Sequence, residues 1–368
     1  MVSGPVEGVV TQVVTAKAPG KLYIAGEYAV VETGYPAIVV AMNQFVTVTV
    51  EQTAEYGSIL SKQYQENSIY WKREGGNLVF DNRDNPFHYI LSAIRLTEEY
   101  AVQCGKELNL YKLSVDSDLD SNDGKKYGLG SSAAVTVATV KALNDFYQLG
   151  MSAPQLYKLA AIAHLEVQGN GSLGDIAASV YGGWIAYRSF DKEWLAVARQ
   201  QFTLSELLTM DWPRLQIELL TPPSNLRLLV GWTGSPASTS QLVDKIALAK
   251  AQKHQEYAQF LADSEQTIEN LIAGFRAQSL DIIQKGINEN RRLLARLADF
   301  SGVQIETQTL KSLRQIADSF GGAAKFSGAG GGDCGIVIID RDKPVAPLLE
   351  QWRQAAIEPL ALRVHEID

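Results

Sequence analysis

The sequence has only two cysteines among 368 residues, Cys104 and Cys334. Neither belongs to a CxxC pair or stands beside a histidine at metal-ligand spacing, which excludes a disulfide framework and a cysteine-ligated metal site. Reduced thiols are typical of the cytoplasm, where we expect this protein. The four histidines also lack metal-ligand spacing, and we expect structural roles for them.

Positive charge and long apolar runs are scarce as well. Lysine and arginine number 33 against 41 aspartates and glutamates, so the formal net charge is −8. Nucleic acids and anionic membranes bind basic surfaces, and we therefore expect neither as a partner. No run approaches the roughly 20 apolar residues of a membrane-spanning helix. Residues 1–17 have no basic start and no long apolar core, so we expect no secretory signal.

The length exceeds what one compact core of ordinary size needs, and the composition, 46% apolar and 20% charged, is that of a globular protein. We expect two domains that share an interface, where clefts form. Residues 211–225 contain Pro213, Pro222 and Pro223. We place the boundary there, with domains at 1–215 and 216–368.

Hydrophobic periodicity predicts the elements of both parts. Residues 9–50, broken by glycine and proline, predict several short strands. Residues 131–146 are rich in Ala and Val and predict a buried helix. The N-terminal part also predicts helices from residue 85, over 154–167 and near 175, and strands at 108–115 and 184–187. The C-terminal part predicts strands at 228–231, 334–340 and 360–367, two long helices over 244–298, and helices at 306–320 and 345–357. Helices packed on one face of an antiparallel sheet suit this order.

The segment KKYGLGSSAAV, which begins at Lys125, is a candidate phosphate-binding loop. Gly128 and Gly130 allow a close backbone approach, and Ser131 and Ser132 begin a helix whose free N–H groups favour anions. The segment is not a Walker motif, because GxxxxGK[ST] is absent. A glycine loop that merely precedes a buried helix is the alternative. The paired lysines at 125 and 126 either contact phosphate or are solvated.

The segment KFSGAGGGDC, which begins at Lys325, is a second such loop. Five glycines between Gly328 and Gly335 leave the backbone free to adopt positive φ and to form a nest of N–H donors. A simple turn is the alternative. Lys325 either reaches a substrate phosphate or caps the preceding helix.

A lysine and an aspartate complete the set. In QGNGSLGDIAAS, Asp175 stands at the start of a helix after three glycines, where it either points into a cleft or serves as an N-cap. Lys21 lies beside Gly20 in APGKLYIAGEYAVV. A lysine beside an aspartate stays charged and can bridge to a transferring phosphate.

The three glycine-rich segments, in this order, resemble the three signature motifs of the GHMP kinases. The likeness covers nearly the whole chain. Within the family it favours the branch whose acceptor is 5-phosphomevalonate. The segments that carry this likeness are APGKLYIAGEYAVVETGYPAIVVAMNQFVTVTV, VGWTGSPASTSQLV and the run from Ile305 to SGAGGGDCGIVI. The likeness implies an α+β, two-domain GHMP kinase fold. The N-terminal domain would be a ribosomal-protein-like α/β domain with a left-handed crossover, the C-terminal domain would be ferredoxin-like, and the active site would lie between them.

The resemblance also implies site residues, an activity and partners. ATP and Mg²⁺ would be required, 5-phosphomevalonate would become 5-diphosphomevalonate on the route to isoprenoids, and a homodimer stays open. Lys21 and Asp175 would be catalytic, and Ser132 would be the Mg²⁺ ligand. The residues implied for ATP are Lys125, Lys126, Gly128, Leu129, Gly130, Ser131, Ser132 and Ala133. Those implied for the acceptor are Lys21, Asn170, Ser172, Ser235, Ser327, Gly328, Ala329 and Gly330.

Two positions depart from the wider family pattern. Gly124 replaces a proline, and lysines follow it; extra positive charge would offset a phosphorylated acceptor, which brings about −1.5 to −2 of charge. His164 stands eleven positions before Asp175, where a glutamate helps to hold Mg²⁺ in the mevalonate-phosphorylating branch. Glu166 would be a weak substitute.

Two alternatives stay open. One is a family member with another acceptor, mevalonate or 5-diphosphomevalonate. The other is a catalytically silent nucleotide-binding regulator, which predicts loss of the lysine or the aspartate, and both are present.

Overall fold

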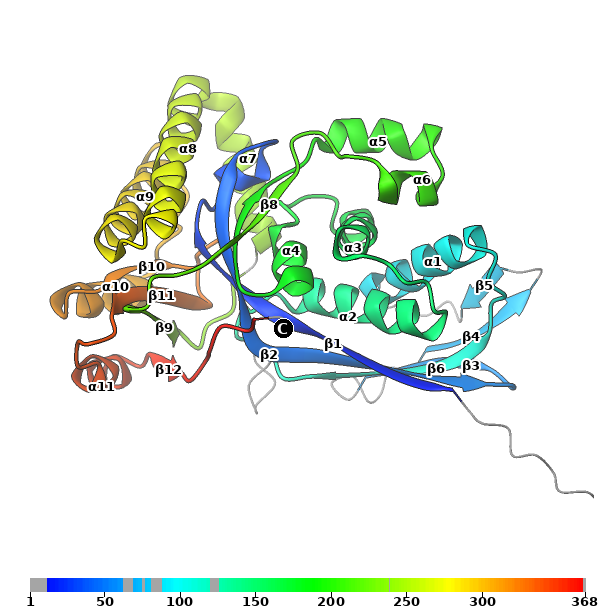
Figure 1. Ribbon diagram of the computed structural model, residues 1–368. Helices are drawn as coiled ribbons and strands as arrows, with labels where there is room; N and C mark the ends of the chain where they lie inside the picture. The colour runs from blue at the N-terminus through cyan, green and yellow to red at the C-terminus, as the bar shows by residue number, and fades with distance from the viewer. Residues whose placement is uncertain are drawn as a thin grey trace, which may run out of the picture.

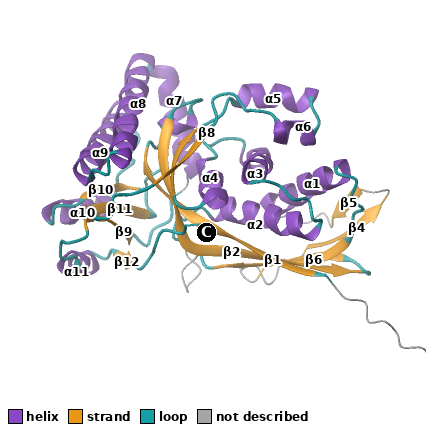
Figure 2. Cartoon of the chain, viewed as in Figure 1, coloured by secondary structure: helices purple, strands orange, loops and turns teal. Residues whose placement is uncertain are grey.

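The computed structural model describes residues 12–61, 69–74, 77–80, 88–119, 126–237 and 239–366. Two sheets organise the chain, one with eight strands and one with four. Helices α1 (His88–Gln103) to α6 (Leu204–Thr209) lie on the side of the large sheet, α9 (Leu280–Ser301) to α11 (Ala346–Gln354) gather around the small sheet, and α8 (His254–Arg276) packs on α9 and on strands of the large sheet (Figures 1 and 2). In the described residues, no helix combines the length and the apolar character needed to cross a membrane.

The large sheet is built around two long antiparallel strands, β1 (Val13–Ala25) and β2 (Pro36–Thr53). The prediction of several short strands was wrong for the described residues 12–50, because Gly20 falls at an irregularity within β1 and does not end it, while Gly26 and Gly34 lie in the single connection between the two strands. The register shifts between Pro19 and Gly20, and Gly26, with φ of 93°, starts the turn to the short 3-10 helix η1 (Ala29–Val31).

The other strands extend from the free side of β2. The order β5-β4-β3-β6-β2-β7-β8 leaves β1 paired with β2 off this path. The remaining bounds are β3 (Gly57–Ser61), β4 (Ile69–Glu74), β5 (Asn77–Phe80), β6 (Leu110–Ser117), β7 (Trp184–Arg188) and β8 (Gln216–Leu220). The helices are α1 (His88–Gln103), α2 (Ser131–Phe146), α3 (Ala153–Gln168), α4 (Gly174–Tyr181), α5 (Lys192–Gln201) and α6 (Leu204–Thr209). The helix expected at 131–146 is thus confirmed, and the predicted cap at residue 85 lies outside the described residues.

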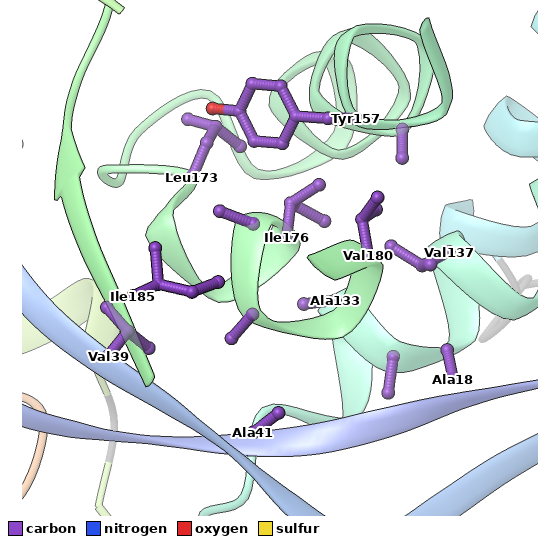
Figure 3. Close-up of a cluster of buried hydrophobic side chains, with 14 of the residues drawn as sticks. Ala18, Val39, Ala41, Ala133, Val137, Tyr157, Leu173, Ile176, Val180 and Ile185 are labelled. Atoms are coloured by element: carbon purple, nitrogen blue, oxygen red, sulfur yellow. The ribbon is translucent and has the colours of Figure 1, made fainter. Parts of the chain in front are cut away.

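Helix α4 is held by its surroundings. Eight residues are too few for a helix to be stable alone. Figure 3 shows Ile176 and Val180 of α4 among buried side chains from the sheet and from neighbouring helices. These neighbours include Ala18, Val39, Ala41, Ala133, Val137, Tyr157 and Ile185. Burial of apolar side chains, about 1.5–3 kcal/mol for each large one, therefore fixes the helix that carries Asp175.

The small sheet has the order β10-β11-β9-β12, and every pairing is antiparallel. Strand β9 (Leu226–Trp232) is followed by helices, then β10 (Ala323–Phe326), β11 (Cys334–Asp340), α11 (Ala346–Gln354) and β12 (Glu358–Leu360). This is the ferredoxin-like arrangement that the family resemblance implied. The helices between β9 and β10 are α7 (Thr239–Gln252), α8 (His254–Arg276), α9 (Leu280–Ser301) and α10 (Gln308–Ser319). Residues 244–298 therefore hold three helices where two were predicted.

The end of the chain returns to the large sheet. The strand predicted over 360–367 lies earlier in the chain, as β12, and the described residues 361–366 leave the small sheet. Val364 instead forms a single bridge with Met42, and Asn43 N donates to the Arg363 carbonyl at 2.9 Å. The domain division at 215 and 216 stays a prediction; β8 begins at Gln216 and pairs with β7, so the large sheet extends to Leu220.

Leu313 tests the packing of the small sheet. It is fully buried, and a Cβ added to Gly231 would lie 2.8 Å from its Cδ1. We expect Leu313→Ala to lower the free energy of unfolding by about 2–5 kcal/mol in urea denaturation, because a cavity remains. Leu248, 69% exposed, is the control, and Leu248→Ala should stay within about 0.5 kcal/mol of the parent. Equal effects of the two changes would contradict this packing.

Candidate active site

A cavity of about 250 Å³ lies where the three glycine-rich segments meet. Most of the residues expected in a site line it. These are Lys21, Lys126, Gly128, Gly130, Ser131, Ser132, Asn170, Ser172, Asp175, Gly328 and Ala329. Segments more than 300 residues apart in the sequence thus contribute to a single site.

The loop before α2 lies directly against Lys21. Gly128 and Gly130 have φ of 81° and 75°, a region that favours glycine. A Cβ on Gly130 would lie 2.8 Å from Cε of Lys21, and Lys21 N donates to the Leu129 carbonyl at 2.8 Å. The free N–H groups at the start of α2 and the Lys21 ammonium therefore face the same cavity, an arrangement suited to phosphate.

Asp175 lies in the first turn of α4 and is not its N-cap, a position held by Leu173. Its Oδ1 accepts a hydrogen bond from Ile176 N at 2.9 Å. Within the described residues no direct ion pair joins Asp175 to Lys21, although both line the cavity. The two side chains therefore share one cavity without a direct ion pair.

A network of hydroxyl groups holds the backbone just before Asp175. The Tyr187 hydroxyl donates to the Ser172 carbonyl at 2.5 Å, and the Tyr157 and Tyr187 hydroxyls are 2.9 Å apart. The Tyr23 hydroxyl lies 2.5 Å from Ser172 Oγ. Burial, reinforced by the nearby Asp175 charge, raises the pKa of Tyr23 well above its usual value. Tyr23 therefore stays neutral and keeps its proton for this network.

Ser132 has a partner that the sequence only partly suggested. His164 Nε2 lies 3.1 Å from Ser132 Oγ, and the ring packs against Tyr89. Burial lowers the pKa of His164, which favours the neutral imidazole, while Asp175 opposes the shift. His164 thus contacts Ser132, the serine expected to bind Mg²⁺. A structural role was expected for this histidine, and the contact is one through which it can also position the serine hydroxyl.

Glu166 does not replace a metal ligand. Its carboxylate accepts from Arg95, from Arg199 at 3.1 Å and from Ser92 at 3.3 Å, and it does not line the cavity. The two arginines that contact it reduce its availability for a cation.

Asp333 was missed by the sequence reasoning, although it is the single acidic residue of KFSGAGGGDC. It lines the cavity, and a Cβ on Gly128 would lie 2.5 Å from its Cγ. Its Oδ1 accepts from Ala237 N at 3.2 Å. Burial raises the pKa of Asp333, while this hydrogen bond and the charges of Lys21 and Lys126 lower it. The second and third loops therefore meet at this carboxylate.

Lys325 has neither of the roles considered for it. It is fully buried in β10 and pairs with Glu27, and its Nζ also donates to the Phe326 carbonyl at 2.6 Å. Burial lowers the pKa of Lys325, and the Glu27 charge opposes that shift. The pair joins the small sheet to the turn after β1.

Several expected residues do not line the cavity. Leu129, in the loop before α2, and Ala133, in the first turn of that helix, are buried. Ser235 accepts from Asp333 N through its carbonyl at 2.8 Å, and Ser327 Oγ donates to the Tyr23 carbonyl at 2.8 Å. Gly330 packs against Ile305, where a Cβ would lie 2.5 Å from a carbonyl oxygen. Lys125 lies outside the described residues. Ligand contacts for these residues stay predictions.

The wall formed by η1 is supported from outside the cavity. Lys192 Nζ donates to the Val31 carbonyl at 2.9 Å and to Ser189 Oγ at 3.3 Å. Glu32 accepts from Lys250 at 2.7 Å and from the Tyr257 hydroxyl at 2.9 Å. These contacts fix Val31, which lines the cavity.

Comparison with known proteins identifies the class. Residues 88–183 match the model for the GHMP kinases N terminal domain, and residues 271–358 match that for GHMP kinases C terminal. The chain belongs to the GHMP kinase family.

Two relatives and a solved structure show which members of the family this chain is similar to. Phosphomevalonate kinase of Streptomyces sp. (strain CL190) is 36% identical over 94% of this chain and 95% of its own length. Mevalonate kinase of Methanocaldococcus jannaschii is 25% identical over 89% of this chain and 92% of its own. Streptococcus pneumoniae phosphomevalonate kinase, in complex with phosphomevalonate and AMPPNP, superimposes with a TM-score of 0.83, at 29% identity over 96% of this chain and all of that one.

Lys192 generates a prediction about pH. Burial lowers its pKa from 10.5 to about 8, against the effect of Glu32. Between pH 8 and 10.5 the unfolded chain then binds more protons than the folded chain, so the contribution of Lys192 to the free energy of unfolding rises with pH. Urea denaturation should show wild type gaining stability relative to Lys192→Met between pH 8 and pH 10. A difference that is constant over this range would contradict the expected shift.

Proposed function

We propose that the chain is a phosphomevalonate kinase, which transfers the γ-phosphoryl group of ATP to 5-phosphomevalonate in the mevalonate route to isoprenoids. The observation that carries the proposal is the joint lining of one cavity by Lys21, Asp175 and the start of α2. The 36% identity to a phosphomevalonate kinase over nearly the full length supports it. We expect the reaction in the cytoplasm, where ATP is supplied. Mevalonate, the acceptor of more distant relatives at 25–28% identity, is the second candidate acceptor.

The reaction brings two anions together. An oxygen of the acceptor phosphate attacks the γ-phosphorus, the bond from that phosphorus to the β-phosphate bridging oxygen breaks, and ADP leaves with the electron pair. Phosphoryl transfer of this kind depends on positioning and charge neutralisation. Lys21 neutralises charge between acceptor and γ-phosphate, and Lys126 adds positive charge at the loop.

The donor atoms fit Mg²⁺. This ion binds through one or two protein oxygens together with substrate phosphates and keeps several waters. Ser132 Oγ and the Asp175 carboxylate line the same cavity and provide hard oxygen ligands, while Glu166 is held by arginines. Bound there with ATP, Mg²⁺ would neutralise charge on the β- and γ-phosphates. Ser132 and Asp175 are the residues that would hold it.

Asp175 acts mainly by orienting Lys21 and Mg²⁺. A phosphate acceptor with a second pKa near 6 is already ionised at neutral pH, so it needs no general base. The hydroxyl of mevalonate would need one. The hydroxyl network holds the backbone at Ser172, three residues before Asp175, and the carboxylate accepts from Ile176 N.

The acceptor is tested with a coupled ADP-release assay. Wild type should turn over 5-phosphomevalonate and leave mevalonate and 5-diphosphomevalonate untouched. Lys21→Met should lower kcat by about 100-fold or more, because a preorganised positive charge is lost, with the KM for ATP changed little. Lys17→Met removes a lysine from the exposed part of the same strand and should behave as wild type. Turnover of mevalonate alone would replace the proposed acceptor, and silence with all three would favour a nucleotide-binding regulator.

The role of Asp175 is tested by the pH dependence of kcat/KM. We expect Asp175→Asn to lower the rate by about 100-fold and to keep the wild-type profile, because ionisation of the acceptor phosphate sets it. Loss of the acidic limb in the variant, with kcat/KM rising in proportion to hydroxide, would instead assign Asp175 as a general base.

A further inference from the structure

Glu27 lies in the cavity wall, yet the mechanism above does not use it. It stands in the turn between β1 and η1, is 3% exposed and lines the cavity. One carboxylate oxygen, Oε1, accepts from Lys325. The other, Oε2, has no hydrogen-bond partner among the described residues. A buried carboxylate oxygen without a donor is unfavourable, so a donor from a ligand would complete this group.

Lys325 fixes the side chain from the small sheet. Its ammonium is fully buried and is shared between Glu27 and the Phe326 carbonyl. The next residue of the turn is tied to the same region, because the Tyr28 hydroxyl donates to the Ala329 carbonyl at 2.5 Å. A buried charge needs such a partner to stay ionised. Glu27 is therefore a fixed hydrogen-bond acceptor at the wall of the cavity.

The surroundings of Glu27 select the kind of donor. Val30, Val31 and Val243 line the cavity together with Glu27, and an unpaired carboxylate oxygen calls for a donor, which phosphate and carboxylate oxygens do not supply. A neutral hydroxyl next to an apolar group suits this wall. The proposed acceptor carries one non-reacting hydroxyl, on the carbon that also bears its methyl group.

We propose that Glu27, held by Lys325, accepts a hydrogen bond through Oε2 from the non-reacting hydroxyl of the acceptor and so determines acceptor specificity. The inference rests on the proposed function. It gives the acceptor a second point of attachment, remote from the phosphate loop, which sets its orientation for transfer. An acceptor that lacks this hydroxyl leaves the buried carboxylate oxygen unpaired and is rejected.

The test compares 5-phosphomevalonate with an analogue in which hydrogen replaces that hydroxyl, by the ratio of their kcat/KM values. Wild type should prefer the hydroxylated acceptor by about 100-fold or more. Glu27→Gln should reduce this preference by about tenfold or more, because its amide oxygen turns toward Lys325 and presents N–H groups to the cavity. Glu51→Gln is the control and should keep the preference; Glu51 is exposed on β2 and does not line the cavity.

Glu27→Asp keeps the carboxylate but shortens its reach toward the acceptor hydroxyl, so it should also lower the preference. If circular dichroism shows that Glu27→Gln does not fold, Glu27→Asp tests the hydroxyl contact in its place. A preference that is the same in wild type and in the Glu27 variants, even with lower rates, would overturn the hydroxyl contact and leave the proposed function standing. Equal use of both acceptors by wild type would also overturn it. Absence of wild-type turnover of 5-phosphomevalonate would refute the proposed function, and the inference with it.

Discussion

The contact between β1 and the loop before α2 is the constraint on which the site depends. Lys21 donates its N–H to the Leu129 carbonyl at 2.8 Å, and Gly130 leaves no room for a Cβ beside the lysine side chain. The backbone of Lys21 is therefore fixed by the loop before α2, whereas the orientation of its ammonium group depends on other charges in the cavity. Helix α4, which carries Asp175, packs between α2 and the same strands (Figure 3). The position of Asp175 is therefore fixed relative to β1 and α2 as well.

The third loop is attached to this frame by three kinds of contact. Ser327 Oγ bonds the Tyr23 carbonyl, the buried Lys325 pairs with Glu27, and Asp333 packs against Gly128. Each joins the small sheet to β1, the turn after it, or the phosphate loop. The cavity therefore has walls from both sheets.

The sequence predicted much of this arrangement, for identifiable physical reasons. Glycines followed by a run rich in Ala and Val predicted α2 at its observed bounds. The positions of Lys21 and Asp175 in the cavity followed from the motifs. The glycine pattern gave a wrong prediction at Gly20, which marks a bulge within β1 and not a turn. Short strands were therefore expected where β1 and β2 are long. The roles of Asp333, and the pairing of Lys325 with Glu27 nearly 300 residues away, depend on tertiary contacts that no local pattern encodes.

The return of the chain end to the large sheet has a consequence for local unfolding. The two sheets are connected covalently between β8 and β9, and a second time where residues after β12 bond the Met42 and Asn43 region. The small sheet therefore belongs to a stretch of chain that is attached to the large sheet at both ends. Fixing both ends of a stretch lowers the conformational entropy that it can gain on local unfolding.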